Sequence, residues 1–133
     1  MKTAVITGAN KGIGFAIAKS LGIKGWHVII GARNKERAET AVTKLQEAGV
    51  SHVDYVLINL SKIETIEEAV KKIQQDFSTI DLLVNNAGIP GGHGSSLTES
   101  IEDLQTTMQV NFFGTFQLTQ GLLPILEKTM VVS

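Results

Sequence analysis

The feature that most constrains the fold of this chain is a strict alternation of short apolar runs with longer amphipathic segments. The apolar runs have the length of buried β-strands, and the segments between them repeat their apolar residues at helical spacing. Such alternation is typical of parallel strands joined by right-handed crossovers, with helices on both faces of the sheet. We therefore expect an α/β fold, a doubly wound parallel sheet of the Rossmann-like kind. The strands are predicted at 4–7, 27–32, 52–60, 80–88 (which includes a turn) and from Met130 onward.

The segments between the strands are predicted as helices. In the first segment Ile13, Ile17 and Leu21 recur every four residues and form one stripe. Gly22 and Gly25 are expected to close that helix. The other helices are expected over 38–48 with Gly49 at the end, over 66–77 with Ser61 as the cap, and over 101–126 with a bend near Gly121 and Pro124.

A glycine-rich loop, TGANKGIG, joins the first strand to the first helix. Gly8 would allow a sharp turn, Gly12 would let a pyrophosphate approach the backbone, and Gly14 would let the helix pack close to the sheet. The free N–H groups at the start of the helix would then face the phosphates. The alternative is an ordinary glycine-rich turn. The position of the loop between the first strand and the first helix favours a phosphate-binding site. The other predicted cofactor-binding residues of this loop are Asn10, Lys11 and Ile13.

The second strand ends in GARNKER, which places Arg33 19 residues after Gly14. At about this distance an NAD site carries Asp or Glu, which binds the ribose 2′-hydroxyl. A guanidinium is suited instead to a 2′-phosphate, and Lys11 lies in reach of the same group. Two cations, Lys11 and Arg33, near the position of the 2′-phosphate favour NADP(H) over NAD(H). The alternative is that they are two unrelated surface cations. We expect residues 1–133 to form a dinucleotide-binding domain.

The composition excludes several classes of protein. The net charge of −1 offers nothing that would recruit nucleic acid or an acidic membrane surface. The absence of cysteine removes disulfides, thiolate catalysis and cysteine-bound metals, and the histidines show no metal-ligand spacing. No run approaches the roughly 18 apolar residues of a membrane-spanning helix. We expect a cytoplasmic protein with no bound metal.

Three motifs now coincide: TGANKGIG after the first strand, NNAG (85–88) after the fourth, and Asn111 within QVNFFGTF on the long helix. Together they resemble the short-chain dehydrogenase/reductase family, in particular its NADPH-dependent carbonyl-reductase-like members. The resemblance covers essentially all 133 residues. It implies hydride transfer between NADP(H) and a small-molecule carbonyl or alcohol.

The resemblance also implies roles for individual residues. Asn86, Ala87 and Gly88 would line the cofactor, and Asn111 would bend its helix and position a water in a proton relay. The family usually has Asp and an aliphatic residue after the third strand, where they contact adenine. Here the pair is Asn59-Leu60, in which the Asn59 carbonyl would still accept from the adenine amino group.

The catalytic set implied by the resemblance is incomplete in this chain. Its proton donor is a Tyr followed four residues later by a Lys, on a helix after the fifth strand. The single tyrosine, Tyr55, lies in the third strand and is followed four residues later by Asn59. The catalytic Ser of the family is usually the second residue of a Ser-Ser pair at the end of the fifth strand. Ser133 matches the first residue of that pair better than the second. Asn111 and Ser133 are thus the catalytic candidates.

The chain stops at MVVS, which looks like the opening of a buried strand. We therefore expect a reductase represented by its N-terminal, cofactor-binding part, with the sheet truncated at the fifth strand. The apolar residues of the 101–126 helix would then leave an exposed face, which predicts a homo-oligomer. The alternative is a half-length, catalytically inactive dinucleotide-binding or interaction protein. Nucleic-acid binding has little support. The apolar residues of this helix are Phe112, Phe113, Phe116, Leu118, Leu122 and Leu123.

Overall fold

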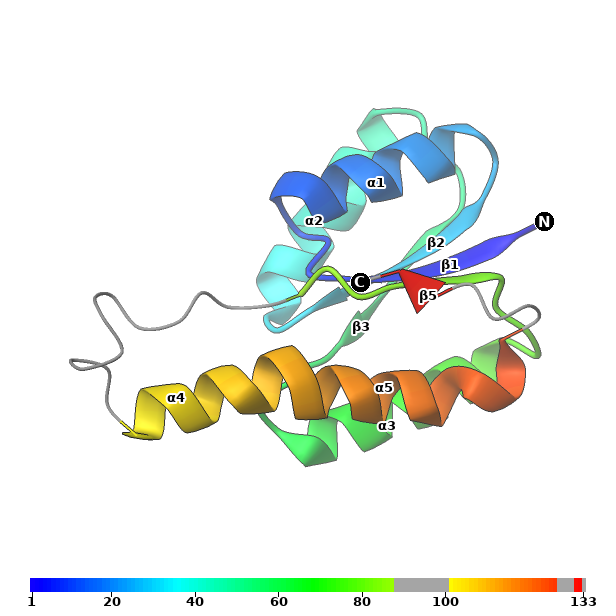
Figure 1. Ribbon diagram of the computed structural model, residues 1–133. Helices are drawn as coiled ribbons and strands as arrows, with labels where there is room; N and C mark the ends of the chain where they lie inside the picture. Colours follow the sequence, from blue (N-terminus) through cyan, green and yellow to red (C-terminus); the bar gives the residue numbers. More distant parts are fainter. Residues whose placement is uncertain (88–100, 127–130, 133) are drawn as a thin grey trace.

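The computed structural model describes residues 1–87, 101–126 and 131–132, and these residues form a parallel five-stranded sheet in the order β3-β2-β1-β4-β5 (Figure 1). The strands are β1 (Thr3–Thr7), β2 (His27–Ala32), β3 (Val53–Leu57), β4 (Leu82–Val84) and β5 (Val131–Val132). The order reverses beside β1, because the chain adds β2 and β3 on one side and β4 and β5 on the other. The doubly wound α/β prediction is confirmed.

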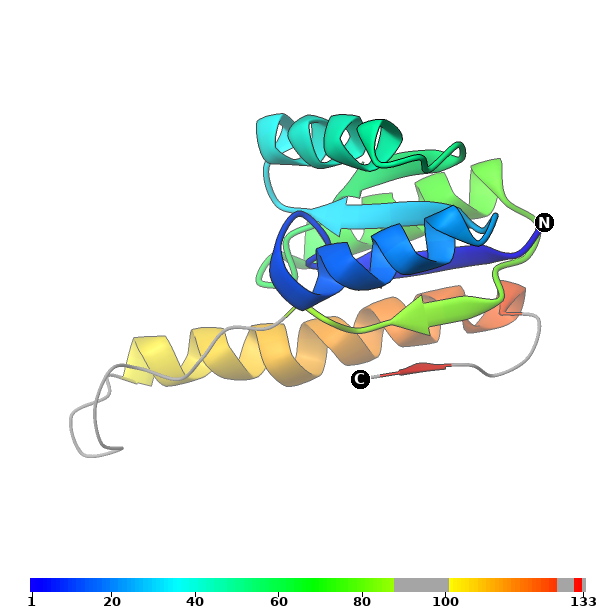
Figure 2. The same ribbon diagram turned by 90° about the horizontal axis from the view of Figure 1, so that it is seen from above.

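Helices cover both faces of the sheet. α1 (Gly12–Ile23) and α2 (Lys35–Glu47) lie on one face, which Figure 2 views from above. α3 (Ile63–Asp76) and the long C-terminal helix lie on the other face. The long helix consists of α4 (Ile101–Met108), the π-helical segment η1 (Gln109–Gly114), α5 (Thr115–Leu122) and the 3₁₀ turn η2 (Leu123–Ile125).

Each face of the sheet packs against its own apolar core, because the side chains of a strand alternate between faces. In β1, Val5 points toward α3 and α5, whereas Ala4 and Ile6 point toward α1 and α2. All five residues of β1 are buried. A central strand buried on both sides explains the unbroken apolar runs of the sequence.

The helix α1 packs only partly as predicted, because Ile17 and Leu21 of the predicted stripe pack against the core and Ile13 does not. Its buried residues are Gly14, Ala18 and Gly22, whereas Ile13, the first residue of the predicted stripe, is 73% exposed. Gly22 lies in the last turn of the helix, which ends at Ile23, and a Cβ there would come within 2.5 Å of Val50 Cγ1. Small residues bring α1 close to the sheet, which a count of apolar side chains does not detect. Gly25, with a φ of 95°, follows the helix as expected.

This close packing yields a stability prediction. Gly22→Ala should lower the free energy of unfolding by about 1 kcal/mol, because overpacking outweighs the helix preference of alanine. In a Val50→Ala background the space opens, and the same change should raise stability by up to about 1 kcal/mol. Urea unfolding of the four proteins measures both values. An equal loss in both backgrounds would show that the Val50 contact is not the cause.

The cap of α3 also differs from the prediction. The N-cap position is Lys62, which makes no side-chain cap, and the Ser61 hydroxyl donates instead to Asn59 Oδ1 at 2.6 Å. The predicted buried stripe of this helix is confirmed at Ile66, Ala69 and Ile73. Gly49, with a φ of 102°, follows α2 as expected.

The long helix is interrupted at two places. The first is the π-helical η1, which contains Asn111 and whose Val110 carbonyl accepts from the hydroxyl of Thr115, the first residue of α5, at 3.1 Å. The second is η2, where Pro124 follows the end of α5. The predicted bend near Pro124 therefore coincides with a helix end. Gly121 instead lies inside α5 and faces Val70, whose Cγ2 would be 2.9 Å from an added Cβ.

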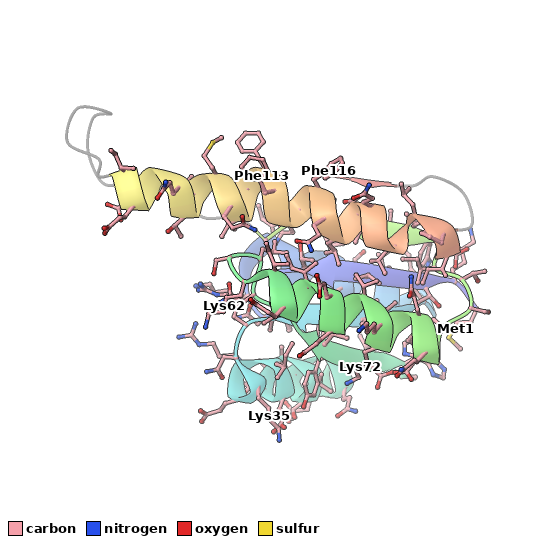
Figure 3. The ribbon with its side chains drawn as sticks, turned by 90° about the horizontal axis from the view of Figure 1, so that it is seen from below. Met1, Lys35, Lys62, Lys72, Phe113 and Phe116 are labelled. Carbon is pink, nitrogen blue, oxygen red and sulfur yellow. The ribbon has the colours of Figure 1, made fainter. Side chains whose placement is uncertain are left out.

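One face of the long helix is apolar and exposed (Figure 3). Phe112, Phe113 and Phe116 are 63%, 60% and 66% exposed. Leu118 and Leu122, on the other side, are buried in the core beneath the sheet. The exposed apolar face expected from the sequence is thus present.

Candidate functional site

A cavity of about 370 Å³ lies at the carboxyl ends of the strands. This is the edge where open parallel sheets bind their ligands, beside the point at which the strand order reverses. Nine of the predicted cofactor residues line the cavity: Gly8, Asn10, Lys11, Gly12, Arg33, Asn59, Leu60, Asn86 and Ala87. The structure therefore brings together residues from four separate segments of the chain.

The glycine loop forms the wall of the cavity between β1 and α1. Gly8 and Gly12 both have a φ of 63°, a conformation that other residues rarely adopt. A Cβ at Gly12 would meet nothing within 4 Å, so the backbone there faces open space. Lys11, the N-cap of α1, makes no side-chain cap. An anion at this position would therefore meet bare backbone and the positive end of the helix dipole.

Two of the predicted cofactor residues of the loop, Ile13 and Gly14, do not line the cavity. Ile13 is exposed beside the cavity. Gly14 is buried, and a Cβ there would lie 2.5 Å from Asn86 Nδ2 and 2.5 Å from the Gly8 carbonyl oxygen. The absence of a side chain at Gly14 thus allows the loop, the helix and the turn after β4 to meet.

Thr7 joins the glycine loop to the turn after β4. Its buried Oγ1 accepts hydrogen bonds from the backbone N–H groups of Asn86 (3.1 Å) and Ala87 (3.0 Å). Asn86 Nδ2 in turn donates to the Gly8 carbonyl at 3.2 Å. These bonds fix the two walls of the cavity relative to each other. The sequence analysis did not select Thr7, although it begins the TGANKGIG motif.

A cationic rim closes the cavity beside β2. Arg33 follows the strand, and Arg37 lies one turn into α2. The Asn34 side chain caps α2 by accepting from the Arg37 N–H at 3.0 Å. Within the described part of the chain, neither arginine nor Lys11 forms an ion pair. Arg37 was not among the predicted cofactor residues, and the signal that places it is Asn34, a helix cap three residues before it.

The far end of the cavity, beyond β3, is mostly apolar. Ala32, Ile58, Leu60 and Val110 line it, with the polar side chain of Asn59 at its edge. Such a slot suits a flat ring better than a phosphate.

Only one of the two catalytic candidates, Asn111, lies among the described residues. Asn111 is half-buried in η1, next to Val110, and does not line the cavity. Gly88 and Ser133 fall outside the described residues. Tyr55 lies in β3, as expected, and its hydroxyl donates to Glu39 Oε1 at 3.3 Å, away from the cavity.

Among the described residues, no group of three or more His, Cys, Asp or Glu side chains is arranged to hold a metal ion. None of the described helices has both the length and the apolar character needed to cross a membrane.

The family follows from comparison with known proteins. A family model for short chain dehydrogenases matches residues 2–131. The chain belongs to the short-chain dehydrogenase family. Its resemblance to that family, stated from three motifs, is thus confirmed over nearly the whole chain.

Individual members of the short-chain dehydrogenase family show the extent of the likeness. Carbonyl reductase 1 of Mus musculus, whose name specifies NADPH, is 38% identical over 125 residues, which cover 93% of this chain and 44% of the relative. Short-chain dehydrogenase anuI of Penicillium roqueforti is 36% identical over 92% of this chain and 49% of its own. A crystal structure of an actinorhodin polyketide ketoreductase with NADPH superposes with a TM-score of 0.84 at 35% identity, covering 92% of this chain and 46% of that one. The chain spans about half the length of these relatives.

Proposed function

We propose that the protein is an NADP(H)-dependent oxidoreductase that transfers hydride between the nicotinamide and a small-molecule carbonyl or alcohol. In this proposal the present chain supplies the cofactor-binding part. The observation that carries it is one cavity with a bare glycine loop at one end and, beside it, a cationic rim that forms no ion pair with any described residue.

The residues present fit a phosphorylated dinucleotide. The backbone at Gly12 leaves room for a pyrophosphate, and the start of α1 offers N–H groups to it. Arg33 and Arg37 sit where the ribose attached to that pyrophosphate would lie, because β2 is the next strand of the sheet. Guanidinium groups bind phosphate through paired N–H donors, so the rim supports a preference for the 2′-phosphate of NADP(H). The cofactor, when bound, supplies the hydride.

The substrate class is supported by relatives rather than by residues of this chain. The mouse relative carries carbonyl reductase in its name, and the superposed structure is a ketoreductase with NADPH. Asn111 is the described residue proposed for proton handling. The π-helical segment that holds it displaces its backbone from regular helical hydrogen bonding, as π-turns at functional sites often do.

We also propose self-association through the long helix. Phe113 and Phe116 project from the exposed side of it (Figure 3), and Phe112 is exposed as well. Burial of such side chains stabilises by about 2 kcal/mol each, which favours contact with a second copy or with further protein surface.

The proposal is tested by binding followed by turnover. We expect the protein that carries this chain to bind NADPH at least about tenfold more tightly than NADH, the worth of one charge-assisted contact. It should then oxidise NADPH in the presence of small ketones and aldehydes. NADPH binding without turnover would limit the function to dinucleotide binding, and failure to bind either cofactor would contradict the proposal.

A further inference from the structure

The π-helical segment η1 is attached to the rest of the protein at one carbonyl group, that of Leu60. Gln109, the first residue of η1, donates to this oxygen from Nε2 at 3.2 Å. A carbonyl oxygen only accepts, so the amide group that faces it is the NH₂ of Gln109. Gly114, the last residue of η1, packs against the same oxygen, with which an added Cβ would collide. Both ends of η1 therefore rest on Leu60, which itself lines the cavity.

The threonine hydroxyl groups of the long helix mark where its register changes. Thr106, Thr107 and Thr119 each donate to the carbonyl group four residues earlier. Thr115 donates instead to the carbonyl of Val110, five residues earlier. The π-helical segment thus adds one residue to helical turns that are otherwise regular, and one residue corresponds to about 100° of rotation about the helix axis.

The two sides of η1 are held unequally. After it, α5 is fixed in the core by Leu118 and Leu122, which are 1% and 0% exposed. Before it, most described side chains of α4 are exposed, and α4 projects past the sheet (yellow in Figure 2). A return to the regular register would therefore turn α4 and the start of η1. That turn would lift Val110 out of the core and break the bond from Gln109 to Leu60.

We propose that Gln109 is a positioning residue for Asn111, which lies two positions further along η1. The inference rests on the proposed function, in which Asn111 handles a proton. By tying the start of η1 to Leu60, the Gln109 amide fixes the rotation of Asn111 about the helix axis. Gln109 does not line the cavity, so it acts through Asn111 rather than on the cofactor. A displacement of about 1 Å at a reacting group can slow a reaction about a hundredfold.

The test uses three variants of the protein that carries this chain. Gln109→Glu keeps the size of the side chain and replaces the NH₂ by a second oxygen, so that only acceptors face the Leu60 carbonyl. Gln109→Lys keeps a donor at the end of a long side chain. Gln105→Glu makes the same change of charge one turn earlier, on the exposed surface of α4, and is the matched control.

The first measurement is turnover of NADPH with a small ketone, together with urea unfolding of each variant. In Gln109→Glu we expect kcat to fall at least about tenfold, with KM for NADPH within about threefold, because the glycine loop and the cationic rim are untouched. The solvent deuterium isotope effect on kcat should increase, because the proton transfer is the step that slows. Gln109→Lys and Gln105→Glu should keep kcat within about threefold. Equal losses of kcat in Gln109→Glu and Gln109→Lys, or in Gln109→Glu and Gln105→Glu, would overturn the proposal.

The second measurement does not depend on turnover. The chain has no cysteine, so Val110→Cys places one thiol at a buried position of η1. Mass spectrometry of the peptide that contains position 110 gives the rate at which a maleimide labels this thiol. Adding Gln109→Glu should raise that rate about tenfold, and equal rates would overturn the proposal. An unmodified protein that does not turn over NADPH would contradict the proposed function, and the labelling rates would still decide whether Gln109 holds η1.

Discussion

Gly14→Ala is expected to abolish dinucleotide binding and to lower the free energy of unfolding by about 3 kcal/mol. The added Cβ would lie 2.5 Å from the Gly8 carbonyl oxygen and 2.5 Å from Asn86 Nδ2. The first of these atoms belongs to the backbone of the glycine loop and cannot move aside as a side chain can. The loop must therefore shift, and the wall of the cavity shifts with it.

Gly49→Ala is the matched control for Gly14→Ala. Gly49 has a φ of 102° and follows α2, and an added Cβ there would meet nothing within 4 Å. We expect a loss of about 1 kcal/mol from backbone strain and no change in NADPH affinity. Thermal unfolding and NADPH titration of both variants give the comparison. If Gly14→Ala binds NADPH as well as Gly49→Ala does, close packing at Gly14 does not shape the site.

The fold was predictable because the signals that specify it are local. β2 occupies the predicted residues, and the buried stripe of α3 follows from its apolar spacing. In α1 the close approach at Gly14 was predicted, whereas the burial of Ala18 and Gly22 was not. Gly14, Ala18 and Gly22 contribute little apolar surface, and their burial depends on how near the sheet the helix can lie.

The two glycines that line the cavity could be predicted from the sequence, because a positive φ is readily adopted mainly by glycine. Gly8 and Gly12 adopt the positive φ that their motif requires, and both line the cavity. The role of Thr7 depends on Asn86 and Ala87, which lie far along the chain. The position of Arg37 depends on the helix cap that Asn34 forms. The orientation of Asn59 depends on two bonds from Ser61, which the sequence analysis assigned to a helix cap.

Replacement of both Arg33 and Arg37 by alanine should weaken NADPH binding by about a hundredfold or more. Each guanidinium contact with a phosphate contributes about 1.5–3 kcal/mol, and each tenfold change in affinity corresponds to about 1.4 kcal/mol. NADH lacks the 2′-phosphate, so its affinity should change by less than about threefold. Both arginines are exposed and unpaired in the described structure, so their removal should leave stability nearly unchanged.

Lys35→Ala supplies the control for general charge. Lys35 lies on α2 between the two arginines, is paired with Glu39 at 3.9 Å and does not line the cavity. Its loss should change NADPH affinity by less than about twofold, because an exposed charge outside the site is screened by salt. Titrations of NADPH and NADH against both variants separate the explanations. Equal weakening of both cofactors in the double variant would mean that the arginines act on the dinucleotide as a whole. Weakening of NADPH alone would identify them as the residues that read the 2′-phosphate.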